Sequence, residues 1–445
     1  MSPAQSPAAV VQSAVGARAE ELVVHLLIQV IAILVATRLM VRLVRKLGQT
    51  DVSGEILAGL VLGPSFLGAI APAAMQRLFT ATTSPIFVAL AQIGLVLLMF
   101  QIGLEFRFKA SLGASKSAVA VVSLAGILVP FALGWATAPW FHRHLAEPRP
   151  QLLGFRLFFA IALSITAIPI LGRIFMDLGL SHTRTAALTI GAAAIDDVAG
   201  WLLLGGVTLI VRHQFSTGLL LARIAALAVY VAFVFMVARP LLKRAISAHL
   251  QRHGELHPAA VSWILLVLFV SGALTSLIGV FAIIGGFVVG AALHDDRLFV
   301  EQWKTRVSPL VNAFFLPIFF AYTGLRTDLG SLAGAGQWVG CLAVIGVAFV
   351  SKLAGAYAGA RLVGESNRSA LAIGVCMNTR ALMELVAINI GYDLGVIPRS
   401  MFAMLVIMAI TSTFMATPLI RWLLRGQESS GAVVTGRPVP ARPAA

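Results

Sequence analysis

Residues 185–211 read TAALTIGAAAIDDVAGWLLLGGVTLIV, an apolar run with two adjacent acidic residues, Asp196 and Asp197, near its centre. The run is long enough to cross a bilayer, because about 20 residues suffice. Each ionised carboxylate there costs roughly 2.5–3.5 kcal/mol on insertion scales, so the pair needs partners or a function that retains it. One interpretation is a structural pair locked by a buried cation. The interpretation we prefer is a site for an ion and a proton.

The composition of the whole chain is that of a membrane protein. Its 445 residues are 59% hydrophobic and 11% charged, with a mean hydropathy of +0.93. Apolar blocks of near-spanning length recur from about Leu22 to Leu424, which predicts an all-α polytopic membrane protein in a lipid bilayer. The formal net charge is +15, but Lys and Arg cluster in the short connections between apolar blocks, so we expect no nucleic-acid partner. Cys341 and Cys376 lie inside apolar blocks and the nine histidines lack metal-ligand spacing, so we also expect no disulfide and no cofactor.

The apolar blocks divide into thirteen predicted spans, preceded by a tail at residues 1–21 and followed by a short disordered tail at residues 425–445. Basic residues concentrate in alternate connections, and the positive-inside rule then places the N-terminus outside and the C-terminus in the cytoplasm. Residues 1–20 lack the pattern of a cleaved signal peptide. The predicted spans are 22–43, 54–70, 86–106, 117–140, 155–179, 183–211, 217–239, 259–277, 279–294, 308–325, 338–360, 369–391 and 400–424.

When the chain is compared with itself after a shift of seven spans, weakly similar stretches align. Gly59-x-x-x-Gly63 in span two corresponds to Gly286-x-x-x-Gly290 in span nine, and a Gly-Leu pair ends both span three and span ten. Because the shift is odd, the two halves have opposite orientations, which is typical of transporters. Small-x-x-x-small spacing is also common wherever transmembrane helices pack closely. Together these similarities favour two inverted six-helix repeats joined by span seven.

Span five contains a helix breaker near its centre. Residues 164–169 read SITAIP, and Pro169 cannot donate to the backbone ladder and frees the carbonyl one turn earlier. An ordinary kink is the alternative interpretation of Pro169 alone. Thr166, beside it, offers an oxygen ligand for a small cation.

Span twelve, which the same shift pairs with span five, is interrupted by polar residues. Residues 376–384 read CMNTRALME, too polar for a helix that faces lipid. Broken helices at corresponding places in two repeats indicate a binding site at the midplane, where freed carbonyls and half-helix C-termini attract a cation. We therefore predict crossed discontinuous helices, with a break at Thr379 and with Asn378 as a cation ligand. Arg380 and Glu384 lie one turn apart, so they can pair with each other or compensate the dipole ends of the broken helices.

Lys352 lies near the middle of span eleven, far from both ends. A lysine at this depth either extends to the interface or pairs with an acid, and we expect an acid partner. Asp196 and Asp197 are both candidates. Neighbouring residues on a helix point about 100° apart, so one carboxylate can face the broken helices and the other Lys352.

With these residues in view, the chain resembles the monovalent cation:proton antiporter-2 family over nearly the whole membrane region, and one stretch is similar to plant cation/proton exchangers. The resemblance implies a homodimer in a bacterial cell membrane, in which a core slides like an elevator against a scaffold. It also implies that Asp197 binds the cation and the proton competitively, and that Asp196 forms an ion pair with Lys352 that breaks on cation binding. The stretches that carry the resemblance are GEILAGLVLGP at 54–64, Ser164 to Leu171, Ala193 with Ile195 to Asp197, Lys352, and NTRALMEL at 378–385.

The expected division follows from this resemblance. Scaffold and dimerisation helices are expected at about 22–106 and 259–325, core helices at about 117–211 and 338–424, and a linker helix at about 217–239. Two departures from relatives stand out. Plant exchangers have Asn and Kef-type systems Gln where this chain has Asp196, as electrogenic bacterial sodium/proton exchangers do. Only residues 426–445 follow the last span, so we expect no attached regulatory domain.

These observations predict a non-enzymatic antiporter that exchanges Na⁺ or K⁺ for H⁺. A passive cation channel is the second hypothesis, but the sequence contains no repeated carbonyl-filter motif. A sodium-coupled solute symporter on a similar fold is another alternative. An intramembrane aspartyl protease needs two aspartates that face each other from different helices, whereas these two are neighbours on one helix.

Overall fold

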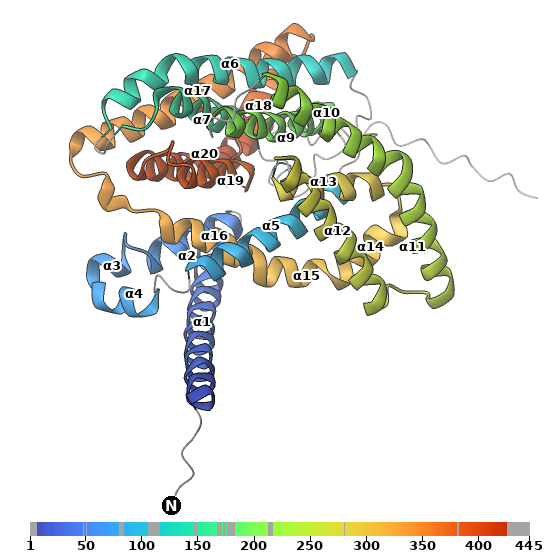
Figure 1. Ribbon diagram of the computed structural model, residues 1–445. Helices are drawn as coiled ribbons and strands as arrows, with labels where there is room; N and C mark the ends of the chain where they lie inside the picture. The colour runs from blue at the N-terminus through green and yellow to red at the C-terminus, as the bar shows by residue number, and fades with distance from the viewer. Residues whose placement is uncertain are drawn as a thin grey trace, which may run out of the picture.

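Every regular element in the described part of the protein is a helix (Figure 1). The computed structural model describes residues 7–47, 49, 51–79, 84–105, 116–145, 149–166, 171, 175, 183–211, 217–279, 281–380 and 382–424. Short π-helical turns, η1 and η2, occupy Val234–Ala238 and Val311–Phe315, and a 3-10 turn, η3, occupies Leu329–Ser331. The α-helices are α1 (Pro7–Lys46), α2 (Asp51–Leu62), α3 (Leu67–Ile70), α4 (Pro72–Leu78), α5 (Ser84–Glu105), α6 (Lys116–Arg143), α7 (Leu152–Ser164), α9 (Arg184–Val211), α10 (Thr217–Phe233), α11 (Arg239–His253), α12 (Pro258–Ile278), α13 (Ala282–Leu293), α14 (Arg297–Arg306), α15 (Ser308–Leu310), α16 (Leu316–Arg326), α17 (Ala335–Leu362), α18 (Asn367–Cys376), α19 (Leu382–Asp393) and α20 (Arg399–Leu424).

The helices follow the order of the predicted spans. Within the described residues, ten helical segments are long and apolar enough to cross a membrane. Two further apolar helices, α7 and α13, are shorter and occupy predicted spans five and nine. Predicted span twelve is divided into α18 and α19. The protein is therefore an all-α, multi-pass membrane protein.

Two helices extend beyond their predicted boundaries. The first begins at Pro7 instead of residue 22, because the preceding Ala-, Val- and Glu-containing stretch continues the helix. The helix predicted to end at residue 239 continues through η1 and α11 to His253, and its added part is polar. Hydropathy marks only the apolar part of a helix, so it underestimated both lengths. The tail predicted at 425–445 lies outside the described residues.

The helices of the predicted scaffold pack through glycines at two related crossings. A Cβ on Gly59 of α2 would lie 2.8 Å from the Cα of Gly324 on α16, and one on Gly290 of α13 would lie 3.0 Å from the Cα of Gly103 on α5. These helices are spans two and ten, and spans nine and three. Each crossing thus joins one repeat to the other, and the two crossings correspond under the shift of seven spans.

A second group of helices surrounds α6, which packs against α7, α9 and α17. The approach of α17 to α6 is close, since a Cβ on Gly355 would lie 2.5 Å from the carbonyl oxygen of Ala125, and one on Gly359 would lie 2.9 Å from the Cα of Val122. Figure 1 shows α6, α7, α9, α17 and α18 in its upper part and α2, α5, α12, α13 and α16 in its lower part. The close packing of α6 with α17 positions Lys352 one turn from Gly355.

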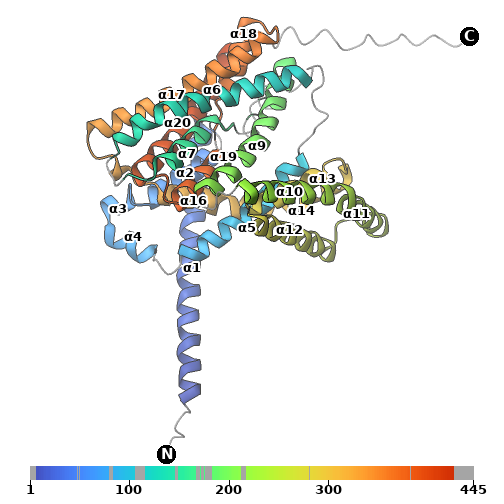
Figure 2. The same ribbon diagram turned by 45° about the horizontal axis from the view of Figure 1, so that its top comes forward.

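The helix formed by α10, η1 and α11 packs against α12 and α13, as Figure 2 also shows. Tyr230 and Ser271 form a hydrogen bond inside this contact. In the first part of α11, Arg239 donates to Asp295 over 2.8 Å, and Lys243 donates to the same carboxylate. Partial burial raises the pKa of Asp295, but the hydrogen bonds from Lys243 and Arg239 outweigh it and lower the pKa to about 2. This helix is therefore fastened to the group that contains α12 and α13.

Candidate ion and proton site

Two helices end at the same place inside the protein. The helix α7 ends at Ser164, and Ile165 is extended with φ −76° and ψ 143°. The helix α18 ends at Cys376, and helix resumes only at Leu382, so Thr379 lies within the break. Pro169 lies outside the described residues. A helix C-terminus leaves its last carbonyls without helical partners and carries a partial negative charge.

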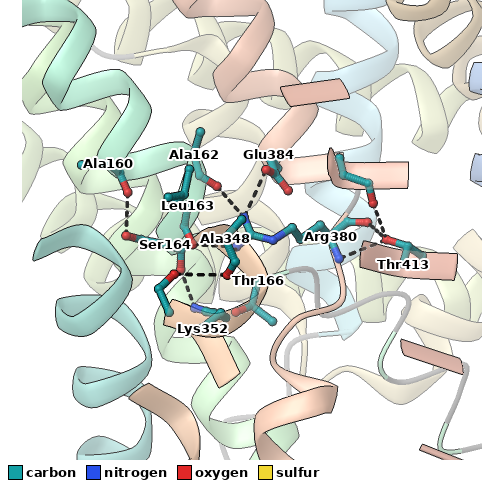
Figure 3. A network of polar contacts seen from close by, with 12 residues as sticks. Ala160, Ala162, Leu163, Ser164, Thr166, Ala348, Lys352, Arg380, Glu384 and Thr413 are labelled. Atoms are coloured by element: carbon teal, nitrogen blue, oxygen red, sulfur yellow. Dashed lines mark hydrogen bonds and ion pairs between the residues drawn. The ribbon is translucent and has the colours of Figure 1, made fainter. Parts of the chain in front are cut away.

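Arg380 covers the C-terminus of α7 (Figure 3). Its Nη1 donates to the carbonyl of Ala162 over 2.7 Å and its Nη2 to the carbonyl of Leu163 over 2.8 Å. The same Nη1 lies 3.1 Å from Oε1 of Glu384, one turn along the chain. Both side chains are fully buried. Arg380 thus both compensates the α7 dipole and pairs with Glu384, which combines the two roles predicted for it.

Lys352 binds the next carbonyl of α7, that of Ser164. Its Nζ donates to the carbonyl of Ser164, to the carbonyl of Gly126 over 2.7 Å and to Oδ2 of Asp196 over 2.9 Å. An ammonium has three N–H donors, and all three have a partner. The last three carbonyls of α7 therefore accept hydrogen bonds from Arg380 and Lys352. The negative end of this helix is compensated by two positively charged side chains.

Both oxygens of Asp196 are held. Its Oδ2 accepts from Lys352 and from Oγ1 of Thr166 over 3.0 Å, and its Oδ1 accepts from Oγ of Ser123 over 2.7 Å. Asp196 is 1% exposed. Of the two candidate acids, the structure pairs Asp196 with Lys352. Sequence reasoning missed Ser123, although a serine in the apolar span 117–140 was a visible signal.

Thr166 connects the two broken segments. Its hydroxyl lies 3.0 Å from Asp196 Oδ2 and 3.2 Å from the carbonyl of Met377 in the second break. A hydroxyl has a single proton, so it donates to one of these acceptors at a time, and its own lone pairs remain available as a ligand.

Asn378 lies at the break before α19 with a free acceptor. Its Nδ2 donates to the carbonyl of Phe349 over 2.8 Å, while its Oδ1 is buried and has no hydrogen-bond partner in the described part of the chain. The hydroxyl of Thr379 donates to the carbonyl of Cys376 over 2.9 Å and so stays within the break. Asp197 is 3% exposed and points about 100° around α9 from Asp196.

Five ionisable side chains at or next to this crossing are at most 3% exposed. They are the carboxylates of Asp196, Asp197 and Glu384 and the cations of Lys352 and Arg380. Asp196 pairs with Lys352, and Glu384 pairs with Arg380. Asp197 is therefore a third buried carboxylate beside two buried ion pairs.

Residues 30–426 match the family described as "Sodium/hydrogen exchanger, transmembrane". The chain belongs to this family. Among curated proteins it is 36% identical over 396 residues to the Na⁺/H⁺ antiporter NhaS4 of Synechocystis, a match that covers 89% of this chain and 96% of that protein. It is 33% identical to cation/H⁺ antiporter 20 of Arabidopsis thaliana and 31% identical to the K⁺/H⁺ antiporter 1 of Saccharomyces cerevisiae, covering 89% and 83% of this chain but only 48% and 43% of those proteins.

The fold agrees with this membership. The structure of the sodium proton antiporter MjNhaP1 from Methanocaldococcus jannaschii superimposes with a TM-score of 0.65, covering 92% of this chain and all of that one at 16% identity. The resemblance to cation:proton antiporters predicted from the sequence is confirmed, and the protein is a cation/H⁺ antiporter on the sodium/proton antiporter fold.

In this exchanger, the helix α20 supports the second break, which lies between α18 and α19. The backbone N–H of Arg380 donates to Oγ1 of Thr413 over 3.2 Å, and the single proton of the Thr413 hydroxyl has two alternative acceptors, the carbonyls of Arg380 and Ala409. A small cavity is lined by Arg380 and Thr413 together with Ser53 and Ile56 of α2. Sequence reasoning missed Thr413, because nothing in the sequence relates it to residue 380.

Proposed function

We propose that the protein exchanges Na⁺ or K⁺ for H⁺ at Asp197, where the cation and the proton compete. The observation that carries the proposal is a buried carboxylate, Asp197, next to Asp196, whose partner Thr166 also contacts the break that contains Asn378. A carboxylate buried in a membrane protein can be neutralised by one monovalent cation or by one proton, and occupation by one opposes occupation by the other. Competition of this kind is sufficient for coupled exchange when the site opens to one side at a time.

The proposed cation ligands are oxygen atoms. Asp197 supplies the charge, Asn378 supplies a buried Oδ1 that accepts nothing in the described part of the chain, and Thr166 supplies a hydroxyl oxygen. Oxygen donors suit small hard cations. Asp196 contributes through its pair with Lys352, which we propose opens when the cation binds. An ion pair that opens and closes in each cycle gives Asp196 a part in the proton balance, which supports electrogenic exchange.

We propose an elevator mechanism for alternating access. The helices around α6 and α17 form the moving core, and the helices joined by the two glycine crossings form the scaffold. The fastening of α10 and α11 to α12 and α13 supports a linker that stays with the scaffold. We further propose a homodimer in a bacterial cell membrane, with the N-terminus outside and the C-terminus in the cytoplasm.

Reconstitution into liposomes tests the exchange. A preset pH gradient is dissipated by Na⁺, K⁺ or Li⁺ added separately, with Asp197→Asn beside the unchanged protein and Asp295→Asn as the control. Asn keeps the shape and hydrogen-bonding capacity of Asp but cannot carry the proton. We expect no cation-driven proton movement from Asp197→Asn and unimpaired exchange from Asp295→Asn.

Two results would overturn the proposal. Normal exchange by a monodisperse Asp197→Asn protein would remove this carboxylate from the mechanism. Cation flux that proceeds at the same rate without any counter-movement of protons would identify a passive channel.

A further inference from the structure

Lys352 lies on α17 and Asp196 on α9, and a third helix, α6, contacts both members of this ion pair. Ser123 donates to Oδ1 of Asp196 over 2.7 Å, and three residues later the carbonyl of Gly126 accepts from Nζ of Lys352 over 2.7 Å. Residues three apart lie on the same face of a helix. One face of α6 therefore offers a donor to the carboxylate and an acceptor to the ammonium.

A backbone carbonyl inside a helix is normally occupied by the N–H four residues later. Four residues after Gly126 is Pro130, which lies inside α6 and has no N–H. The carbonyl of Gly126 is free for Lys352 because of this proline. A proline in the middle of a membrane span otherwise weakens the helix, so the position calls for a compensating interaction.

The same arrangement recurs at two other prolines inside described helices. Pro139, also in α6, frees the carbonyl of Trp135, which accepts from Nε of Arg156 over 3.2 Å. Pro418 in α20 frees the carbonyl of Phe414, which lies 3.4 Å from Nε2 of Gln49. At these positions a side chain from another segment takes the place of the missing N–H. Of the three freed carbonyls, that of Gly126 accepts from a residue of the candidate site.

Close packing brings the ammonium to this carbonyl. Glycines 355 and 359 of α17 allow α6 to approach, and a Cβ added at Gly126 itself would lie 4.0 Å from Oδ2 of Asp196. Among the described residues, the charged groups that act on Lys352 are Asp196 on α9, followed along that helix by Asp197, and Arg380 and Glu384 at the second break. The partners that α6 and α7 contribute are uncharged, so they stabilise the ion pair without changing the net charge of the site.

We propose that Pro130, through the carbonyl of Gly126, and Ser123 are positioning residues that stabilise the closed Lys352–Asp196 ion pair and thereby set the pH range of exchange. The proposal rests on the proposed function, in which the pair opens when the cation binds. Loss of the Gly126 acceptor disfavours the charged form of Lys352, and loss of the Ser123 donor disfavours the charged form of Asp196, because a hydrogen bond to a charged group favours that form. The two changes therefore weaken the pair from opposite sides and shift the pH range in opposite directions.

The expected effects have a definite direction. Pro130→Ala restores an N–H that occupies the Gly126 carbonyl and straightens the helix, so the ammonium is held less well and is lost at lower pH. A hydrogen bond to a charged group corresponds to a shift of about one pH unit. We therefore expect half-maximal exchange to move about one unit toward acid pH, and the apparent Km for the cation to fall several-fold at pH values below the original midpoint.

The pH profile of cation-driven exchange in proteoliposomes is the primary measurement. Pro139→Ala is the matched control, because it restores an N–H in the same helix at a carbonyl that serves Arg156. We expect an unshifted profile from Pro139→Ala. A second measurement, the rise in Tm on addition of the cation as a function of pH, reports cation binding without transport, and we expect it to shift with Pro130→Ala in the same direction.

Ser123→Ala provides a test that leaves the backbone intact, which matters if Pro130→Ala fails to fold. Its control is Ser351→Ala, beside Lys352, because the Ser351 hydroxyl bonds only to the carbonyl of Ala348, 3.1 Å away, among the contacts described. Because Ser123 donates to a carboxylate, we expect an alkaline shift from Ser123→Ala, recovery of the original profile by Ser123→Thr, and no shift from Ser351→Ala.

The outcomes separate this inference from the proposed function. If Asp197→Asn abolishes exchange but the profiles of Pro130→Ala and Ser123→Ala match that of the unchanged protein, the α6 partners have no positioning role and the inference is wrong. Equal shifts from Pro130→Ala and Pro139→Ala would show that straightening of α6 causes the effect, and not the Gly126 carbonyl. That result would overturn the inference. An acid shift from Ser123→Ala would also overturn the inference, because the loss of a donor to the carboxylate would not account for it.

Discussion

Lys352 is the residue at which the parts of the site meet. Its three donors reach α6 at Gly126, the end of α7 at Ser164 and α9 at Asp196. Each partner comes from a different helix, so the position of one ammonium depends on how four helices pack. A buried ion pair with satisfied hydrogen bonds is costly to break from one side, because the remaining charge loses its partner.

The ion pair makes a prediction about stability. Lys352→Ala leaves Asp196 buried and uncompensated, which should lower the free energy of unfolding by about 3–5 kcal/mol. Adding Asp196→Asn to Lys352→Ala removes the remaining charge and should recover part of that loss. Thermal unfolding of both single variants and the double variant in one detergent measures the coupling. Losses that simply add would show that the two residues are not energetic partners.

At the scale of elements, glycines decide which helices can cross. A Cβ at Gly59 would lie 2.0 Å from the carbonyl oxygen of Ala321, and one at Gly290 would lie 2.2 Å from that of Phe100. Backbone atoms cannot rotate away as a flexible side chain does, so either methyl group forces two helices apart. In contrast, a Cβ at Gly346 in α17 meets nothing within 4 Å.

These distances predict opposite effects from one kind of substitution. Gly59→Ala and Gly290→Ala should each destabilise the protein by about 1–3 kcal/mol through overpacking. Gly346→Ala should be neutral or stabilise it by roughly 0.5–1 kcal/mol, because Ala favours the helix. The Tm of each purified variant checks the order. A loss from Gly346→Ala as large as that from Gly59→Ala would mean that close approach is not the reason for these glycines.

At the scale of the whole molecule, a polar cluster connects the proposed scaffold to the proposed core at the C-terminal end of α16. Arg326 donates to Oδ1 of Asn389 over 3.1 Å, pairs with Asp393 and lies over the ring of Tyr392 at 4.7 Å. Asn389 in turn donates to the hydroxyl of Thr323 over 3.1 Å. Thr323 and Arg326 lie on α16 and Asn389, Tyr392 and Asp393 on α19, so the contacts between these two groups would have to break if the core slid along the scaffold. The cluster therefore favours the conformation described.

Removing the cluster should open this side of the molecule. In a Cys341→Ser, Cys376→Ser background, a cysteine at Thr323 should react about tenfold faster with a membrane-impermeant thiol reagent after Arg326→Ala, the factor that corresponds to one lost charged hydrogen bond. Arg156→Ala is the control, since that guanidinium lies 4.1 Å from the ring of Trp135 and both residues belong to the proposed core. Unchanged labelling after Arg326→Ala would show that the cluster does not hold the two groups together.

The sequence by itself determined the features that depend on local pattern. Hydropathy gave the positions of the membrane helices, and the CMNTRALME stretch indicated the break between α18 and α19. The depth of Lys352 required a buried acid, and the corresponding glycines indicated two related halves. Each of these follows from how the bilayer treats a residue at a given depth, which needs no knowledge of neighbouring helices.

Only the tertiary structure decided which groups meet. It selected Asp196 over Asp197 as the partner of Lys352, and it brought Ser123, 73 residues away, to the same carboxylate. It also assigned the freed carbonyls of α7 to Arg380 and Lys352. Sequence reasoning had related these carbonyls to a transported cation, and had related Arg380 only in general terms to the dipole ends of the broken helices. The physical reason is that these contacts join helices far apart in the chain, and the rotation of a helix about its axis and its choice of neighbours depend on how all the helices pack together.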